Sequence, residues 1–148
     1  MEEVPSGRGV AAKYRSAMSI EKINPSTLME PAGYSHIVVA SGTKRVYVAG
    51  QTGVDSDGTL AGPDLASQTA QALRNVSAAL EAGGATWDDV AKMTILVVGY
   101  EPSMADALFS GIGEVFGDAM PVPAVTLHGV QSLFEPQFLV EIEVIAEV

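Results

Sequence analysis

The clearest hydrophobic alternation in the chain lies near its C-terminal end. From residue 138 to residue 144 the even-numbered positions are apolar, whereas Glu141 and Glu143 occupy the other face. A period of two indicates a β-strand with one face against a core. Residues 124–128 alternate in the same way, and we expect this segment to pair with the C-terminal strand across the loop 129–137.

Other runs rich in β-branched residues predict the remaining strands. Residues 35–40 and 45–49 are joined by Ser-Gly-Thr-Lys at 41–44, which is typical of a hairpin. Residues 20–23 form a run short enough for an edge strand, ended by the Asn-Pro pair that follows it. The apolar run 90–98 predicts a buried strand.

A 3.6-residue apolar period that starts at Leu65 predicts the first helix. Asp64 precedes it as a candidate N-cap, and Gly83-Gly84 can end it. Residues 86–89 have the spacing of a capping box for one short helical turn. The inward positions are expected at Leu65, Thr69, Ala72, Leu73, Val76 and Leu80.

A second helix is predicted between a capping box at Ser103 and Asp106 and a stop at Gly117. The elements then run β-ββ-α-β-α-ββ. This order predicts an α+β fold, a two-layer sandwich in which two helices cover one face of a mixed β-sheet. The inward positions of the second helix are expected at Met104, Leu108, Val115 and Phe116.

Composition narrows the classes of function. A length of 148 residues is typical of one domain. The formal net charge is −10 and the eight basic residues are scattered, which argues against nucleic acid as a partner. The longest apolar run, 93–98, is too short to span a membrane. A hydrophobic content of 47% is high for a monomer, so we expect apolar surface between subunits.

The segment 1–17 mixes Gly, Pro, Ser and charged residues without an apolar period. We expect it to be a flexible extension, which leaves 18–148 as the domain. It lacks the apolar stretch of a secretory signal, so the expected location is cytoplasmic. The chain contains no cysteine, which excludes disulfides and thiolate chemistry.

The two histidines, His36 and His128, could form a two-histidine, one-carboxylate metal site with Glu141. Isolated histidines far apart in sequence are more often ordinary polar residues, and we expect no metal and no other cofactor. Residues 55–58, Asp-Ser-Asp-Gly, begin like a calcium loop but lack the later ligands. A tight turn is expected there.

Four segments carry a family resemblance: GYSH at 33–36, VYVAGQTG at 46–53, the helix that begins at Asp64, and VEIEVIAEV at 140–148. In this order they resemble the RidA (YjgF-like) reactive-intermediate deaminase family, over about residues 18–148. The resemblance implies a homotrimer with clefts between its subunits. It also implies hydrolysis of imines or enamines to a carbonyl compound and ammonia.

An arginine that this family uses is missing here. Active members carry it in a Pro-Ala-Arg-Ser-like segment before the penultimate strand, where this chain reads Met-Pro-Val-Pro-Ala-Val from Met120. Aligning the strand valines places Val122 at the arginine position, and counting from the end of the second helix places Pro123 there. No Lys or Arg follows Lys92. Because a guanidinium binds a carboxylate through two parallel hydrogen bonds, activity on common 2-imino acids should be weak or absent.

The resemblance also suggests the site residues. Glu141 matches the family's glutamate that positions a water, and it is the expected acid–base group. Tyr34 lies in the segment that lines the family's cleft, and we expect it to act with Glu141, whereas Glu143 is expected to be structural. The expected substrate contacts are Gly50, Val122, Ala124, Thr126 and His128.

Two classes of function remain open. The favoured one is a hydrolase of an imine, an enamine or a related small pathway intermediate, and a dedicated substrate that lacks a carboxylate remains open. The alternative is a non-catalytic small-molecule-binding or regulatory trimer, because an apolar residue in place of the arginine fits a ligand that is only held. Turnover of an imine above the buffer rate separates the two.

Overall fold

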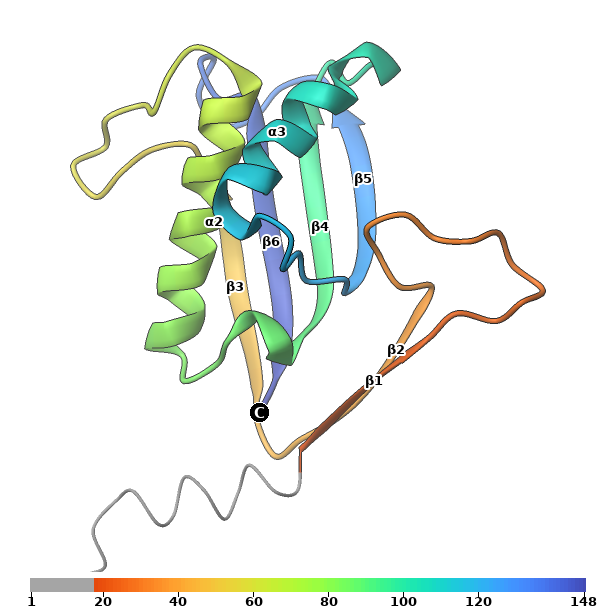
Figure 1. Ribbon diagram of the computed structural model, residues 1–148. Helices are drawn as coiled ribbons and strands as arrows, with labels where there is room; N and C mark the ends of the chain where they lie inside the picture. The colour runs from red at the N-terminus through yellow and green to blue at the C-terminus, as the bar shows by residue number, and fades with distance from the viewer. Residues whose placement is uncertain (1–17) are drawn as a thin grey trace, which may run out of the picture.

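The computed structural model describes residues 18–148, and the predicted extension 1–17 lies outside the described residues. Two α-helices pack on one face of a mixed four-stranded sheet, and two further strands form a separate pair (Figure 1). The predicted α+β two-layer sandwich is therefore confirmed. The elements are β1 Ser19–Ile23, β2 Ile37–Ser41, β3 Arg45–Thr52, α2 Leu65–Ala82, β4 Val90–Val98, α3 Ala105–Phe116, β5 Ala124–Val130 and β6 Val140–Glu147.

The four-stranded sheet has the order β3-β6-β4-β5. Strand β6 is antiparallel to β3 and β4, and β4 is parallel to β5. The predicted pairing of 124–128 with the C-terminal strand is wrong, because β4 lies between them. Helix α3 connects β4 to β5 as a crossover, which makes these two strands parallel neighbours and leaves the other edge of β4 for β6.

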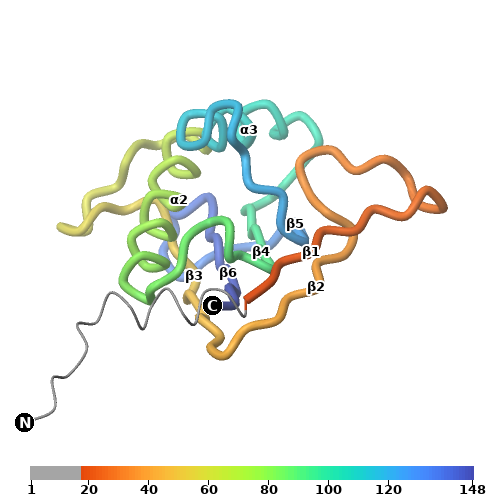
Figure 2. Tube along the Cα trace, turned by 60° about the horizontal axis from the view of Figure 1, so that its bottom comes forward, coloured from red at the N-terminus to blue at the C-terminus, as the bar shows by residue number. Residues whose placement is uncertain are grey.

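The predicted hairpin between 35–40 and 45–49 is also wrong. Strand β2 pairs with β1, whereas β3 pairs with β6. The backbone N–H groups of Thr43 and Lys44 donate to the carbonyl of Val148, at 3.0 and 2.8 Å. These bonds direct the chain to the end of β6 instead of closing a hairpin. Figure 2 shows the β1–β2 pair outside the body formed by the sheet and helices.

The core lies between the sheet and the two helices. The even positions of β6 are buried there, as the alternation predicted, and so are all six inward positions predicted for α2. The helices approach closely at Gly111, where a Cβ atom would lie 2.5 Å from the carbonyl oxygen of Ala66. The largest fully buried apolar side chains are Leu73, Val76, Leu80, Val90, Val97, Val140, Ile142 and Val144.

The two predicted capping boxes have different outcomes. The Thr86–Asp89 box forms, since the Thr86 N–H donates to Asp89 Oδ2 at 2.7 Å. The box at Ser103 and Asp106 does not cap α3. A 3₁₀ turn at Pro102–Met104 precedes this helix, so Met104 occupies the N-cap position, and its side chain has no oxygen that could accept a hydrogen bond.

None of the helices within 18–148 is long and apolar enough to cross a membrane.

Asp64 caps α2 as predicted. The Ser67 backbone N–H donates to Asp64 Oδ1 and the Ser67 hydroxyl donates to Oδ2, both at 2.8 Å. These hydrogen bonds hold the pKa of the Asp64 carboxyl below its usual value, and the bond from the Ser67 backbone N–H has the largest effect. A folded-state pKa below the unfolded one means that the charged cap stabilises the protein at neutral pH. The stabilisation is lost as pH falls from about 4 through the folded-state pKa.

Asp64→Ala should therefore lower the Tm at pH 7, and the deficit should shrink in acid. Melting curves of both proteins between pH 7 and pH 3 measure this. Asp64→Asn is the matched control, because it keeps an acceptor for the Ser67 N–H without a titrating group. A deficit of equal size at every pH would contradict the assignment.

Candidate functional site: two half-sites on opposite faces of the sheet

Glu141 lies on the open face of the sheet, the face opposite to the helices. Its neighbours in β6, Val140 and Ile142, are buried toward α2, so alternation turns Glu141 the other way. Its side chain crosses the backbone of β3 at Gly50, where a Cβ atom would lie only 1.8 Å from Glu141 Oε1. The β3 ladder is irregular there, between Val48 and Gln51. The carboxylate thus occupies space that exists because residue 50 is glycine.

The Glu141 carboxylate is half-buried. Within the part of the chain that the structure describes, it accepts no hydrogen bond and forms no ion pair. Glu143, two residues further along the same face, is exposed. Glu141 is therefore a carboxylate with free acceptor atoms on a rigid strand, next to the backbone of Gly50.

The predicted contacts on β5 share the open face but stand apart from Glu141. Ala124, Thr126 and His128 alternate with Val125 and Leu127, which face the helices. Strand register places His128 beside Leu96, and Leu96 beside Glu141. Two strand spacings, about 10 Å, therefore separate His128 from Glu141.

Basic side chains near the sheet are engaged with other groups. Lys92 Nζ donates to Thr126 Oγ1 at 2.5 Å on the open face. Arg45 donates to the hydroxyl of Tyr47 and forms an ion pair with Glu147, and both partners raise the pKa of its guanidinium. Arg74, on α2, pairs with Glu114.

Tyr34 lies on the helix side of the sheet. The next residue, Ser35, is almost fully buried. It forms hydrogen bonds that connect the loop of Tyr34 to the segment before β5. Its hydroxyl donates to the Val122 carbonyl at 2.6 Å, and its N–H donates to the Pro123 carbonyl at 2.9 Å. Val122, predicted as a substrate contact, thus supplies a carbonyl that holds the Tyr34 loop.

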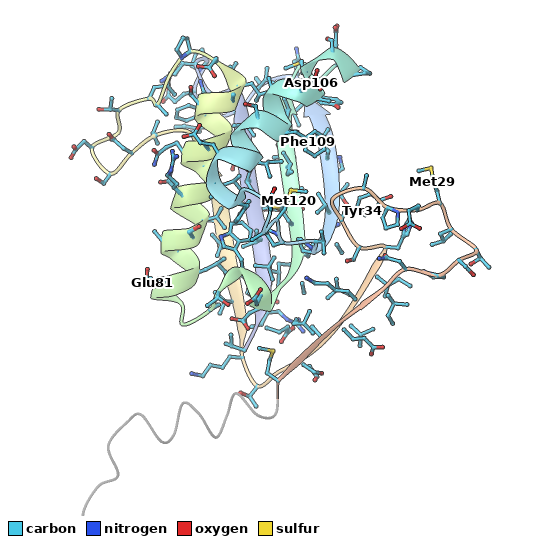
Figure 3. All side chains as sticks on the ribbon, viewed as in Figure 1. Met29, Tyr34, Glu81, Asp106, Phe109 and Met120 are labelled. Atoms are coloured by element: carbon cyan, nitrogen blue, oxygen red, sulfur yellow. The ribbon has the colours of Figure 1, made fainter. Side chains whose placement is uncertain are left out.

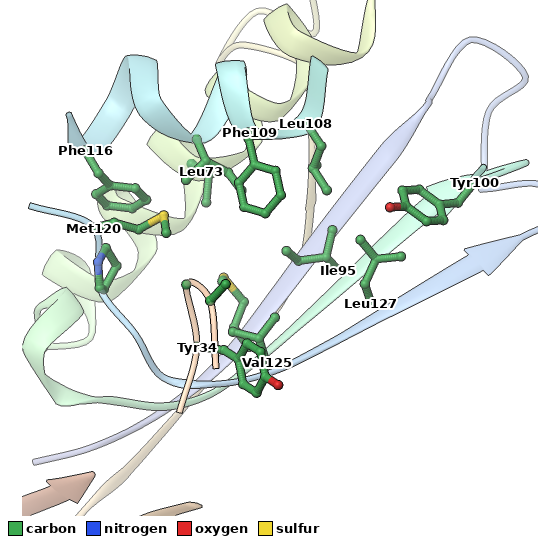
Figure 4. Close-up of a pocket in the computed structure, with 15 residues that line it drawn as sticks. Tyr34, Leu73, Ile95, Tyr100, Leu108, Phe109, Phe116, Met120, Val125 and Leu127 are labelled. Atoms are coloured by element: carbon green, nitrogen blue, oxygen red, sulfur yellow. The ribbon is translucent and has the colours of Figure 1, made fainter. Parts of the chain in front are cut away.

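Tyr34 lines a cavity of about 260 Å³ beneath α3. In Figure 3 Phe109 and Met120 border this region from the helix side, with Tyr34 across from them on the loop before β2. In Figure 4 Tyr100 lies at one end of the labelled set and Phe116 and Met120 lie at the other, with Tyr34 between the two ends, near Val125. The other lining residues are Ala32, Gly33, Leu73, Met93, Ile95, Leu108, Ile112, Phe116, Pro121, Val125 and Leu127.

The cavity suggests a different position for the missing arginine. Residues 123–126 read Pro-Ala-Val-Thr, which matches the Pro-Ala-Arg-Ser pattern with Val125 in third place. Val125 lines the cavity with Tyr34, whereas among residues 18–148 neither Val122 nor Pro123 is part of its lining. We therefore favour Val125 over Val122 and Pro123 as the equivalent of the arginine.

The structure does not gather the residues of the considered metal site. His36 Nε2 is 2.7 Å from the Met29 carbonyl, and its ring packs edge-on against Tyr34 at 5.3 Å. His128 is exposed on β5. No group of three His, Cys, Asp or Glu side chains within residues 18–148 is arranged to hold a metal ion.

Sequence reasoning missed most of the cavity wall. Phe116 was expected to point inward, but only as part of a continuous core. Tyr100, Phe109 and Met120 carried no signal that separates a cavity wall from packed core. An apolar residue on an inward face satisfies the same pattern in both cases.

Comparison with known proteins decides the family. The family model described as endoribonuclease L-PSP matches residues 24–148. The chain belongs to this family. The match includes the segments that carry Tyr34, Gly50 and Glu141, and the likeness to RidA and YjgF proteins is confirmed.

Solved structures of Rid-family proteins share the fold. The Rid-family protein YyfB from Yersinia pestis is 35% identical over 87% of this chain and 98% of its own, with a TM-score of 0.77. A YjgF/YER057c/UK114 family member from Mycobacterium tuberculosis is 32% identical over 89% and 100%, with a TM-score of 0.55. RidA from an Antarctic Psychrobacter is 26% identical over 81% and 92%, with a TM-score of 0.61.

Proposed function

We propose that this Rid-family protein hydrolyses an imine or enamine in a cleft completed between two copies of the chain. The observation that carries the proposal is the Glu141 carboxylate lying over Gly50 with its acceptor atoms free. A half-buried carboxylate on a rigid strand is well suited to proton transfer. Family membership supports the reaction class.

The reaction needs a water, a proton shuttle and a held substrate. Glu141 accepts a proton from water as the water oxygen bonds to the imine carbon, which gives a carbinolamine. The same carboxyl returns this proton to nitrogen, which completes the neutral carbinolamine. It then carries the hydroxyl proton to nitrogen, so that the carbon–nitrogen bond breaks and ammonia leaves as the carbonyl forms. One water is consumed, and no oxidant or metal is required by this balance.

The site is proposed to lie between two copies because, within one chain, its two parts lie on opposite faces of the sheet. Tyr34 and the cavity lie on the helix side of the sheet, whereas Glu141 and Gly50 lie on the open face. A closed homotrimer can present the open face of one copy to the cavity of the next. The open face also exposes 69% of Tyr47, an apolar surface suited to an interface.

Within residues 18–148 the cavity lining contains no cation that could anchor a substrate carboxylate. Val125 cannot form the paired hydrogen bonds of a guanidinium. We therefore expect no useful acceleration when an amino-acid oxidase generates 2-imino-3-phenylpropanoate from phenylalanine. Ketone release with and without the protein measures this. Rapid turnover would mean that Lys92, Arg45 or another cation leaves its present partner to bind the carboxylate.

The same assay includes a neutral counterpart. An amine oxidase acting on 2-phenylethylamine makes an imine with the same ring and no carboxylate. Acceleration of this hydrolysis above the buffer rate is the expected result. No acceleration of any imine or enamine would overturn the proposed function.

A second function is favoured by the apolar character of Val125 and Leu127 in the cavity wall. In this alternative the trimer binds a small molecule without converting it, so ligands raise the Tm of the protein and are not consumed.

The charge of the chain argues against hydrolysis of RNA. The net charge of −10 and the carboxylates Glu141 and Glu143 on the open face both repel phosphates.

A further inference from the structure

We propose that the cavity beneath α3 selects an uncharged, largely apolar small molecule with a flat ring and one polar group. As a statement about the substrate it rests on the proposed function. As a statement about binding it stands on the cavity alone. The cavity is formed by the loop before β2, by α3 and by strands β4 and β5 (Figure 4).

Charge is the first selective feature. None of the lining residues, all of which belong to the described part of the chain, carries a charged side chain. Moving an ionised carboxylate from water into such a space without a partner is unfavourable, because no group there replaces the hydration that the charge loses. Uncharged ligands avoid this cost, so they should bind in preference to carboxylates of the same shape.

Size and shape are the second feature. At the ~30 Å³ that a water molecule occupies in the liquid, a space of about 260 Å³ holds roughly nine non-hydrogen atoms. That is enough for one six-membered ring with a short chain, and too little for a peptide segment. Phe109, Phe116 and Tyr34 offer ring faces and edges, while Met93 and Met120 can adapt to the outline of the ligand.

The polar group of the ligand has two candidate partners. Tyr34 and Tyr100 both line the cavity, and neither hydroxyl forms a hydrogen bond with another residue in the described range. In Figure 4 the hydroxyl of Tyr100 points toward the labelled apolar side chains. A phenol hydroxyl can donate to an imine nitrogen or a carbonyl oxygen. The cavity therefore satisfies one neutral acceptor and leaves the remaining ligand surface to apolar contacts.

The loop that closes the cavity is firmly placed. Gly33 has φ of +78°, and a Cβ atom there would lie 2.8 Å from Met120 Cε. Together with the two hydrogen bonds of Ser35, this close approach holds Tyr34 against the segment before β5. The cavity wall is thus preformed, which lowers the entropy that a ligand loses on binding.

Phenylacetone and phenylpyruvate test the selection, because they differ at one position, where a methyl group replaces the carboxylate. Neither is an imine, so binding is measured without turnover. Titration calorimetry on the full chain should give a Kd for phenylacetone at least about 10-fold below that for phenylpyruvate. Equal affinity, tighter binding of phenylpyruvate, or no binding of either compound overturns the proposal.

Variants locate the binding in the cavity. Phe109 is 52% exposed on α3, so Phe109→Lys should fold, and its ammonium at the cavity should reduce the preference for phenylacetone by about 10-fold. Phe134→Lys is the matched control, because Phe134 is 92% exposed and is not part of the lining. An unchanged preference in Phe109→Lys, or an equal change in Phe134→Lys, places the binding elsewhere and overturns the proposal.

Val125→Arg is the stronger variant and should reverse the preference, since a guanidinium can bind the carboxylate of phenylpyruvate. Circular dichroism and light scattering establish first that it folds and assembles as the wild type does. If phenylacetone binds selectively but no imine is hydrolysed, the cavity assignment holds and the proposed function fails. If imines are hydrolysed and phenylpyruvate binds as well as phenylacetone, the proposed function holds and this inference fails.

Discussion

Replacing Glu141 with glutamine is expected to lower the rate of imine hydrolysis by about 10²-fold or more. Glutamine keeps the shape of the side chain over Gly50 but cannot accept the proton of water. The stability should change by less than about 0.5 kcal/mol, because Glu141 has no ion pair in the described chain to lose. Turnover at substrate saturation and urea unfolding measure the two effects.

Glu143→Gln is the matched control for this variant. Glu143 points to the same face of β6 but is exposed and has no glycine beneath it. Its replacement should leave the rate within about twofold of the wild type. An unchanged rate in Glu141→Gln would remove this residue from the mechanism, and equal losses in both variants would indicate a general effect of charge.

Gly50→Ala tests the same carboxylate without altering it. A Cβ atom at residue 50 would overlap Glu141 Oε1 at 1.8 Å, so the carboxylate must move. Activity should fall although both carboxylates remain. Full activity in this variant would show that the present position of Glu141 is not the working one.

Mixing two variants, each altered in one of the two parts of the site, tests whether the site lies between copies. Light scattering must first report a trimer. Glu141→Gln and Val125→Arg are then unfolded together and refolded at equal amounts. If each site combines the cavity of one copy with the carboxylate of the next, one of the three sites in every mixed trimer regains both intact parts, which is about a quarter of the sites over all trimers. No recovery would place both parts in one chain and contradict the intersubunit site.

Gln68→Leu is expected to destabilise the fold by about 2–4 kcal/mol, the largest loss of stability that we predict. Gln68 is fully buried on α2. Its amide nitrogen donates to the carbonyls of Gly62 and Gln137, at 2.9 and 3.1 Å, and its oxygen accepts from the Leu139 N–H at 2.9 Å. Leucine fills the volume but leaves these backbone groups without partners.

The loss should also reach the site, because Leu139 leads directly into the strand that carries Glu141. Urea unfolding with an unchanged m-value measures the stability term. Gln71→Leu, one turn further along α2, is the control. Gln71 is half-buried, and within residues 18–148 its side chain bonds only to that of Asn75. The loss of stability on its replacement should therefore stay below about 1 kcal/mol. A similar loss in both variants would contradict the role assigned to Gln68.

Sequence alone determined the faces of the elements. The period of two in residues 138–144 put Val140, Ile142 and Val144 in the core and Glu141 on the other face, and the structure agrees. The apolar stripe from Leu65 and the cap at Asp64 were likewise readable, because periodicity and capping depend on residues within one or two turns. The order of elements and the four quoted segments sufficed for the fold class and the family.

Tertiary structure alone decided which strands are neighbours and which candidates meet. Alternation tells which way a side chain points, but not which strand lies beside it. Both predicted strand pairings were therefore wrong, because the α3 crossover places β5 beside β4, and the hydrogen bonds to Val148 direct the chain after β2 to the end of β6. The same non-local pairing separated Tyr34 from Glu141. Packing created the cavity beneath α3, because an inward apolar side chain looks the same in sequence whether its neighbours fill the space beside it or leave it open.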